Sequence, residues 1–134
     1  MDGAAGQRRC TGAAGGIVSV DQGLVDRVAE MVAPLGAPSS RRMMGGAMLY
    51  CDGIAYGIVD DDQLWFKADV ASNAAWDEAG AVRFTYDRAG QIATMNYRRA
   101  PDDCYDDDDA FRHWAGLALE AGRRAAAKKA ARRR

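Results

Sequence analysis

Residues 48–67, MLYCDGIAYGIVDDDQLWFK, decide the fold class because they hold three short apolar stretches separated by two polar turns. The Asp52-Gly53 pair is a strong signal for a tight hairpin turn. Residues 54–58 then alternate large and small side chains, as a strand with one buried face requires. A second turn at Asp60–Asp62 leads into a third apolar stretch. We therefore predict a three-stranded antiparallel meander over Arg41–Lys67.

A helix is predicted on each side of this meander. Upstream, Ser19 and Gln22 have the spacing of a capping box, in which each side chain satisfies a free backbone N–H. An apolar stripe at helical spacing follows this cap and consists of Leu24, Val28, Met31, Val32 and Leu35. Downstream, Asp69–Ala79 is rich in alanine and stops at Gly80, which is typical of a short helix with glycine just past its end.

The remaining elements complete one sheet and one more helix. Residues 82–86 and 91–98 are predicted strands on either side of a turn, and a last helix begins within Asp106–Asp109. Phe111 and Trp114 lie on the apolar stripe of that helix and are expected to be buried against the sheet. The order α-β-β-β-α-β-β-α predicts a two-layer α+β fold with a five-stranded antiparallel sheet.

The length of 134 residues indicates one domain with a sizeable core. We expect a flexible leader over residues 1–18, a folded domain over 19–125 and a basic tail over 126–134. The three cysteines have no CxxC spacing, which argues against a disulfide framework and favours a reducing compartment. With no apolar run of about 18 residues, we expect no membrane contact and a cytoplasmic location.

The sequence offers little that could carry chemistry. His113 is the only histidine, and Cys51 and Cys104 are far apart, so no familiar zinc pattern is present. The run Asp106–Asp109 lacks the spacing of a calcium loop and suits the positive end of a helix dipole instead. We predict no catalytic residues, no cofactor and no stoichiometric metal.

The residues most suited to binding gather near the meander. Gly45-Gly46 is the pattern closest to a phosphate loop, but a strand rather than a helix follows it. A backbone bend or bulge in the first strand is the stronger interpretation. The candidate binding residues are Arg41, Arg42, Gly45, Gly46, Lys67 and Tyr97. Each of the charged and aromatic ones could equally be an ordinary surface residue of the sheet.

The C-terminus is strongly basic, whereas the chain as a whole has a net charge of −1. Seven positive charges fall in the last dozen residues, namely Arg123, Arg124, Lys128, Lys129, Arg132, Arg133 and Arg134. They could extend the last helix as a solvated end that complements its dipole. Alternatively, they form a disordered arm that contacts nucleic-acid phosphates without reading sequence. Lys128, Lys129, Arg132, Arg133 and Arg134 are the candidate contacts.

Short motifs in a consistent order carry a family resemblance. They are Arg41-Arg42-Met43-Met44-Gly45-Gly46, Leu49-Tyr50, Asp52-Gly53, Tyr56-Gly57-Ile58, Leu64-Trp65-Phe66-Lys67-Ala68-Asp69, Ala79-Gly80, Phe84-Thr85-Tyr86, Met95-Asn96-Tyr97-Arg98 and Trp114. Over residues 20–125 the chain resembles the N-terminal domain of TfoX/Sxy competence regulators. It departs from relatives at Met44, where they often carry Phe.

The resemblance implies a role in regulating DNA-uptake genes alongside the cyclic-AMP receptor protein. It brings no established catalytic residues, and the chain is expected to be a stand-alone form without the helical C-terminal domain of longer members. The leading hypothesis is a non-enzymatic regulatory module that contacts a protein partner or small ligand, and a homodimer is compatible with it. The alternatives are a nucleic-acid-associated protein acting through its tail and an enzyme with an unrecognised pocket.

Overall fold

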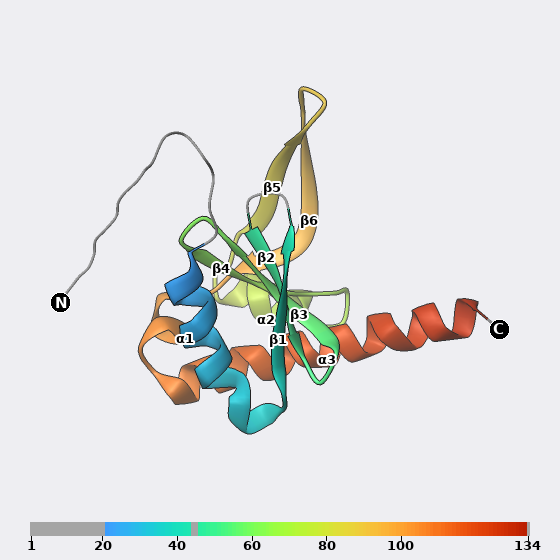
Figure 1. Ribbon diagram of the computed structural model, residues 1–134. Helices are drawn as coiled ribbons and strands as arrows, with labels where there is room; N and C mark the ends of the chain where they lie inside the picture. Colours follow the sequence, from blue (N-terminus) through green and yellow to red (C-terminus); the bar gives the residue numbers. More distant parts are fainter. Residues whose placement is uncertain (1–20, 44–45, 134) are drawn as a thin grey trace.

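The computed structural model describes residues 21–43 and 46–133 and shows an α+β fold (Figure 1). Its six-stranded sheet has the order β1-β2-β3-β4-β6-β5, and every neighbouring pair is antiparallel. The strands are β1 (Pro38–Met43), β2 (Gly46–Cys51), β3 (Ile54–Asp60), β4 (Gln63–Lys67), β5 (Arg83–Arg88) and β6 (Gln91–Arg99). The helices are α1 (Gln22–Val32), α2 (Asn73–Glu78) and α3 (Asp108–Arg132), with short 3-10 turns η1 (Ala33–Leu35) and η2 (Asp102–Tyr105).

The predicted fold class is confirmed, but the predicted number of strands is wrong. The additional strand is β1, which pairs with β2 from Pro38 opposite Cys51 to Met43 opposite Gly46. All six of its residues are exposed, because it lies at the edge of the sheet and away from the core. An edge strand of this kind needs no apolar alternation, so the sequence pattern gave no signal for it.

The extra strand also changes the role of the glycine pair. Gly46 opens β2 rather than forming a bulge inside the first strand, and Gly45 lies outside the described residues. A Cβ added at Gly46 would collide with the carbonyl oxygen of Val59 on the neighbouring strand. Gly46 is therefore explained by the close approach of two backbones and not by a phosphate loop.

Helix α1 begins later than the predicted capping box requires. Its N-cap is Asp21, whose side chain accepts a hydrogen bond from the Leu24 N–H at 3.0 Å, and Gln22 is the first helical residue. Ser19 lies outside the described residues. The carboxylate of Asp21 therefore caps the helix in place of the predicted Ser19 hydroxyl. Asp and Ser are equally favourable N-cap residues.

The core lies between the sheet and the three helices. Phe66 on β4 is fully buried and contacts Trp76 of α2 and Phe111 of α3, each with ring centroids 5.7 Å away. Trp114 stacks on Trp76 at 4.6 Å and stays partly buried, whereas Phe111 is completely buried. The prediction that Phe111 is buried against the sheet is therefore confirmed, whereas Trp114 is only partly buried and contacts α2.

The opposite face of the strands forms a second, smaller apolar cluster. The hydroxyl of Tyr97 on β6 lies 3.7 Å from the sulfur of Met48 on β2, although β3 and β4 separate these strands in the sheet order. The sheet must curl for these side chains to meet, and Ile58 on the intervening β3 is only 4% exposed. We call this side the helix-free face, because the apolar cluster that contacts the helices includes none of these three residues.

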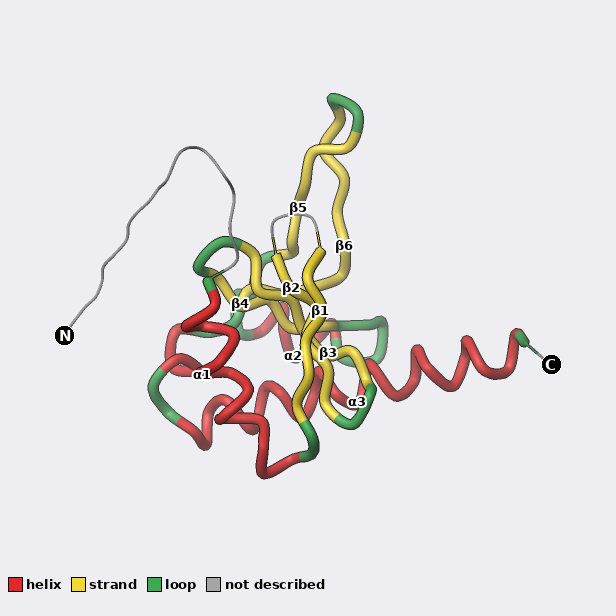
Figure 2. Tube along the Cα trace, in the orientation of Figure 1, coloured by secondary structure: helices red, strands yellow, loops and turns green. Residues whose placement is uncertain are grey.

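Two segments extend beyond the two-layer body. Strand β4 pairs with Tyr97–Arg99 of β6, whereas Gln91–Met95 pair only with β5. This hairpin of β5 and β6 rises above the helices in Figure 2, where the helices lie together at the lower part of the view. The second extension is the end of α3, where residues 123–133 are all exposed and project beyond the sheet (Figure 1).

The boundaries proposed from sequence meet the structure only in part. The leader over residues 1–18 and Arg134 lie outside the described residues. The basic segment is helical up to Arg132, so the helical interpretation of the C-terminus is confirmed over the described part. Within residues 21–43 and 46–133, the helices are too short or too polar to serve as membrane spans.

Candidate functional site

The six binding residues proposed from sequence do not form one cluster. Arg41 and Arg42 are both exposed on β1, but adjacent residues of a strand point to opposite faces. Arg41 is opposite Met48 and so belongs to the helix-free face, whereas Arg42 is opposite the core residue Ala47. Neither arginine forms an ion pair within the part of the chain that the structure describes.

Lys67 and Tyr97 do lie together, as opposite residues of β4 and β6. The Lys67 ammonium lies 5.2 Å from the centre of the Tyr97 ring, which is a cation–π contact. Burial, together with nearby Tyr50, raises the pKa of Tyr97 to about 12. Burial also lowers the pKa of Lys67, against the opposing effect of Asp69. The pair thus presents one positive charge on a largely apolar surface.

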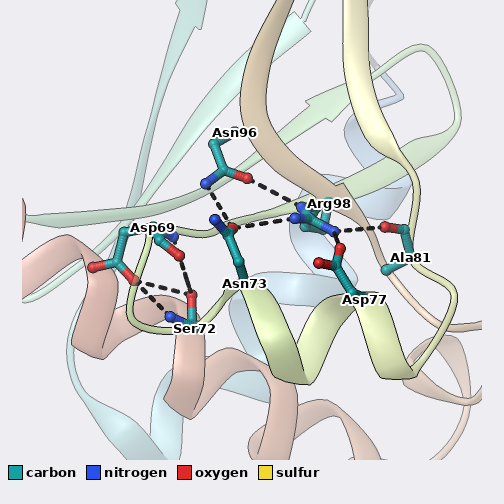
Figure 3. Close-up of polar contacts among 7 residues, drawn as sticks. All are labelled: Asp69, Ser72, Asn73, Asp77, Ala81, Asn96 and Arg98. Atoms are coloured by element: carbon teal, nitrogen blue, oxygen red, sulfur yellow. Dashed lines mark hydrogen bonds and ion pairs between the residues drawn. The ribbon is translucent and has the colours of Figure 1, made fainter.

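Arg98 is the most buried charged side chain among the described residues, with 1% of its surface exposed. Its guanidinium donates from Nη1 to Asp77 Oδ1 at 2.7 Å and to the Ala81 carbonyl at 3.0 Å. It also donates from Nη2 to Asn73 Oδ1 at 3.1 Å and from Nε to Asn96 Oδ1 at 3.0 Å, as Figure 3 shows. Two of these four bonds reach α2, one reaches the loop after it, and the bond to Asn96 stays within β6, so this arginine holds α2 and its following loop against the strand.

A second polar contact joins the loop after β4 to α3. Arg124 donates to both carboxylate oxygens of Asp69, from Nε at 2.6 Å and from Nη2 at 3.0 Å. Asp69 also accepts from the backbone N–H and hydroxyl of Ser72. The hydrogen bond from Arg124 is the main cause that lowers the pKa of Asp69 to about 2. One of the seven basic C-terminal residues is therefore already paired within the chain.

Sequence reasoning identified neither of these polar contacts. Arg98 was quoted only as part of a motif, and Asp69 and Arg124 are 55 residues apart in the sequence. A charged residue in a predicted strand, in register with core positions, is the signal that could have identified Arg98. No signal in the sequence pairs Asp69 with Arg124, because that contact depends on where the long helix crosses the sheet.

The described residues contain no arrangement suited to nucleophilic or metal chemistry. Cys51 and Cys104 are buried free thiols, and burial raises the pKa of both, that of Cys104 to about 12. The exposed His113 contacts the ring of Trp114 edge-on, at 4.8 Å. Over residues 21–43 and 46–133, no three His, Cys, Asp or Glu side chains converge as metal ligands. Asp107 caps α3 by accepting from Asp109 and Ala110.

A shallow pocket of about 320 Å³ lies beside the start of β5. It is lined by Ala79–Val82 on one side and by Arg99–Asp102 on the other. Arg99 and Asp102 are its only charged side chains, and the other lining residues are small or apolar. Its lining residues do not include a nucleophile paired with a general base.

The end of α3 carries the remaining candidate residues. Lys128, Lys129, Arg132 and Arg133 are exposed on the part of the helix that extends past the sheet. Lys129 and Arg132 lie in its last turn, where positive charge complements the helix dipole. These four cations form no ion pair among the residues described, in contrast to Arg124. They are available to an anionic partner.

The fold and these contacts together define a class of protein. It is a small two-layer α+β domain in which Arg98 attaches α2 to the sheet and Arg124 attaches the loop after β4 to α3. Its unpaired cations lie on the outside, on an edge strand and on the end of a helix.

The family model of the TfoX N-terminal domain matches residues 30–122. The chain belongs to this family, and the resemblance seen in the sequence is confirmed. The chain is also similar to the DNA transformation protein TfoX1 of Aliivibrio fischeri (strain ATCC 700601 / ES114), with 31% identity over 74 residues. That match covers 55% of this chain and 35% of the relative, so the matched region is about a third of the length of the curated protein.

Proposed function

We propose that this chain is a regulatory interaction module that acts in DNA transformation by binding a partner and not by catalysis. The observation that carries the proposal is membership of the TfoX N-terminal domain family, supported by the name of the similar protein from Aliivibrio fischeri. The commitment of Arg98 and Asp69 to internal contacts is consistent with a scaffold that presents surfaces. The site of action is the cytoplasm in this proposal, which cell fractionation tests.

The surface proposed for a protein partner is the edge strand β1. Its residues are all exposed, and its outer backbone groups have no neighbouring strand in the described structure. Edge strands can pair with an added strand from another chain. Arg41 and Arg42 would give such a contact a preference for acidic partners. Of the six residues selected from sequence, this assignment keeps Arg41 and Arg42 and places the contact on the edge of the sheet.

The experiment is capture of partners from the native lysate by the intact tagged chain, followed by mass spectrometry. An Arg41→Glu/Arg42→Glu double variant should lose a specific partner, because it reverses two exposed charges without disturbing the core. Arg112→Glu is the matched control, since Arg112 lies on α3 and contacts only Asp109 among acidic side chains. Transformation frequency should fall with the double variant and not with the control. Equal capture by all three proteins would refute β1 as the partner surface.

A second candidate function is weak, sequence-independent contact with duplex DNA through the end of α3. The four unpaired cations on an exposed helix favour it. Affinity from such contacts must fall steeply with added salt, because binding releases counterions from the phosphates. Removal of Lys128–Arg134 should abolish retention on duplex DNA whatever its sequence. Retention by the truncated chain with undiminished affinity would place the DNA surface on the sheet.

A further inference from the structure

Three aromatic side chains form a continuous ladder on the helix-free face. Trp65 on β4 meets Phe84 on β5 edge-on, with ring centroids 5.1 Å apart. Phe84 stacks with Tyr86 of the same strand at 6.1 Å, with ring planes 25° apart. All three residues are partly exposed, and none belongs to the core that contacts the helices. The ladder leads from the body of the sheet onto the projecting hairpin of β5 and β6.

Positive charge surrounds this ladder. Arg99 is opposite Trp65 in the register, and strand alternation places Arg88 on the same side as Phe84 and Tyr86. Lys67 follows Trp65 on the same face of β4. The same alternation assigns Arg41 to this face, and among the described strand residues Asp60 is the only acidic one that it places there. The face is therefore cationic, although the chain as a whole has a net charge of −1.

We propose that the helix-free face binds single-stranded nucleic acid, with bases stacking on the Trp65–Phe84–Tyr86 ladder and phosphates contacting the surrounding cations. Sequence-tolerant single-strand binding generally combines aromatic platforms with a positive surface, because every base has a π-face and every linkage carries a charge. Exposed aromatic side chains on a sheet are one established way to stack unpaired bases. This inference goes beyond the proposed function, which requires only a protein partner.

The charge and the exposed rings of the helix-free face favour single-stranded nucleic acid over other ligands. A second copy of the chain would bring the same four cations against each other, which opposes pairing of this face with itself. A proline-rich peptide could use the aromatic side chains but leaves the cations without partners. An acidic polypeptide could use the cations but offers no planar groups for stacking. Duplex DNA keeps its bases stacked inside the helix, so it can use the cations alone.

The test measures binding of a fluorescein-labelled oligothymidylate of about 15 nucleotides, within the site sizes that single-strand binders use. Fluorescence anisotropy is recorded for the intact chain, for Tyr86→Leu and for Arg88→Glu. Tyr86→Leu keeps an apolar side chain on the hairpin but removes the ring, and it should weaken binding about fivefold or more. Thr85→Ala is the matched control, because Thr85 is exposed on the other side of the same strand. It should bind like the unmodified chain.

Far-UV circular dichroism and the melting temperature show whether each variant keeps its fold. Should Tyr86→Leu disturb the hairpin, Arg88→Glu decides the question, because Arg88 is exposed and its reversal leaves the ladder in place. It should weaken binding and reduce the salt dependence. The matched charge control is Arg112→Glu on α3, which lies outside the helix-free face and should have no effect.

Three further arms separate this surface from the others. Tyr86→Leu should weaken oligothymidylate binding by the same factor in the intact chain and in the chain without Lys128–Arg134. It should not change the affinity for duplex DNA of equal length. Loss of all oligothymidylate binding on removal of the tail would overturn the proposal. So would equal affinity for polyglutamate, which would assign the face to an acidic polypeptide. These assays use purified protein, so they can fail while partner capture through β1 succeeds.

Discussion

Replacing Arg98 with methionine should destabilise the protein by about 3 kcal/mol. Methionine fills much of the same space, but it donates no hydrogen bonds. Asn73 Oδ1 would keep its bond from Asn96 Nδ2 at 2.9 Å, and Asp77 is 65% exposed at its side chain, so water can solvate it. The Ala81 carbonyl and Asn96 Oδ1 would each lose the hydrogen bond that they accept from Arg98. Two orphaned acceptors at about 1 to 2 kcal/mol each account for the magnitude.

The assay is urea unfolding at neutral pH, followed by circular dichroism and by tryptophan fluorescence. The melting temperature should also fall, by roughly 12 °C for a domain of this size. Arg99→Met is the matched control, because Arg99 is the next residue on β6 and bonds only to Gln63 through its side chain. It should change stability by less than about 0.5 kcal/mol. Asp77→Asn should also destabilise the protein, because it removes the carboxylate that pairs with a guanidinium only 1% exposed, although the amide oxygen can still accept from Nη1.

An Arg98→Met protein whose stability lies within about 1 kcal/mol of the unmodified chain would contradict this prediction. It would mean that the Arg98 contacts only offset the cost of burying its charge, as some buried ion pairs do. Equal losses for Arg98→Met and Arg99→Met would also refute it. In that case the effect would belong to the strand and not to the buried guanidinium.

Three further predictions concern stability. Asp69→Asn should destabilise the protein at neutral pH, because the ionised carboxylate stabilises the folded state. Since its pKa is lowered to about 2 in the folded protein, this stabilisation is complete above about pH 4 and is lost as pH falls to about 2, where the difference between the two proteins should vanish. Unfolding curves across this pH series test the sign. Gly122→Ala should cost about 1 to 3 kcal/mol because the added Cβ meets the Ala55 carbonyl, whereas Gly116→Ala, in open space, should be neutral or slightly stabilising in the same assay. Removing Lys128–Arg134 should leave the melting temperature nearly unchanged, because residues 128–133 are exposed and bury little; a shift of more than a few degrees would contradict this.

Much of the architecture could be predicted from local patterns. The Asp52-Gly53 turn, the alternation in β3 and the glycine after α2 each depend on neighbouring residues, and the structure has these elements where they were expected. Gly80 adopts a positive φ of 73°, which explains why glycine ends that helix. The start of α3 was also predicted, because Asp107 caps the helix from its own first turn.

The candidate site could be predicted less well, since it depends on contacts between distant segments. Lys67 and Tyr97 were selected separately, and only the pairing of β4 with β6 makes them neighbours. Gly46 was selected as a binding residue, yet the structure explains it by the proximity of Val59. The ladder of Trp65, Phe84 and Tyr86 was not predicted, because its first two members come from strands that are not adjacent in the sheet.

Turns, caps and alternation are encoded in short stretches of chain, and these were enough to predict the fold class, the antiparallel strands and the family. Tertiary structure alone decided three features. It added β1, whose exposed residues carry no burial pattern, and it buried Arg98 under α2. It also curled the sheet so that Tyr97 reaches Met48. Each of these depends on which strands become neighbours and on how far the sheet bends, and no local stretch of sequence contains that information.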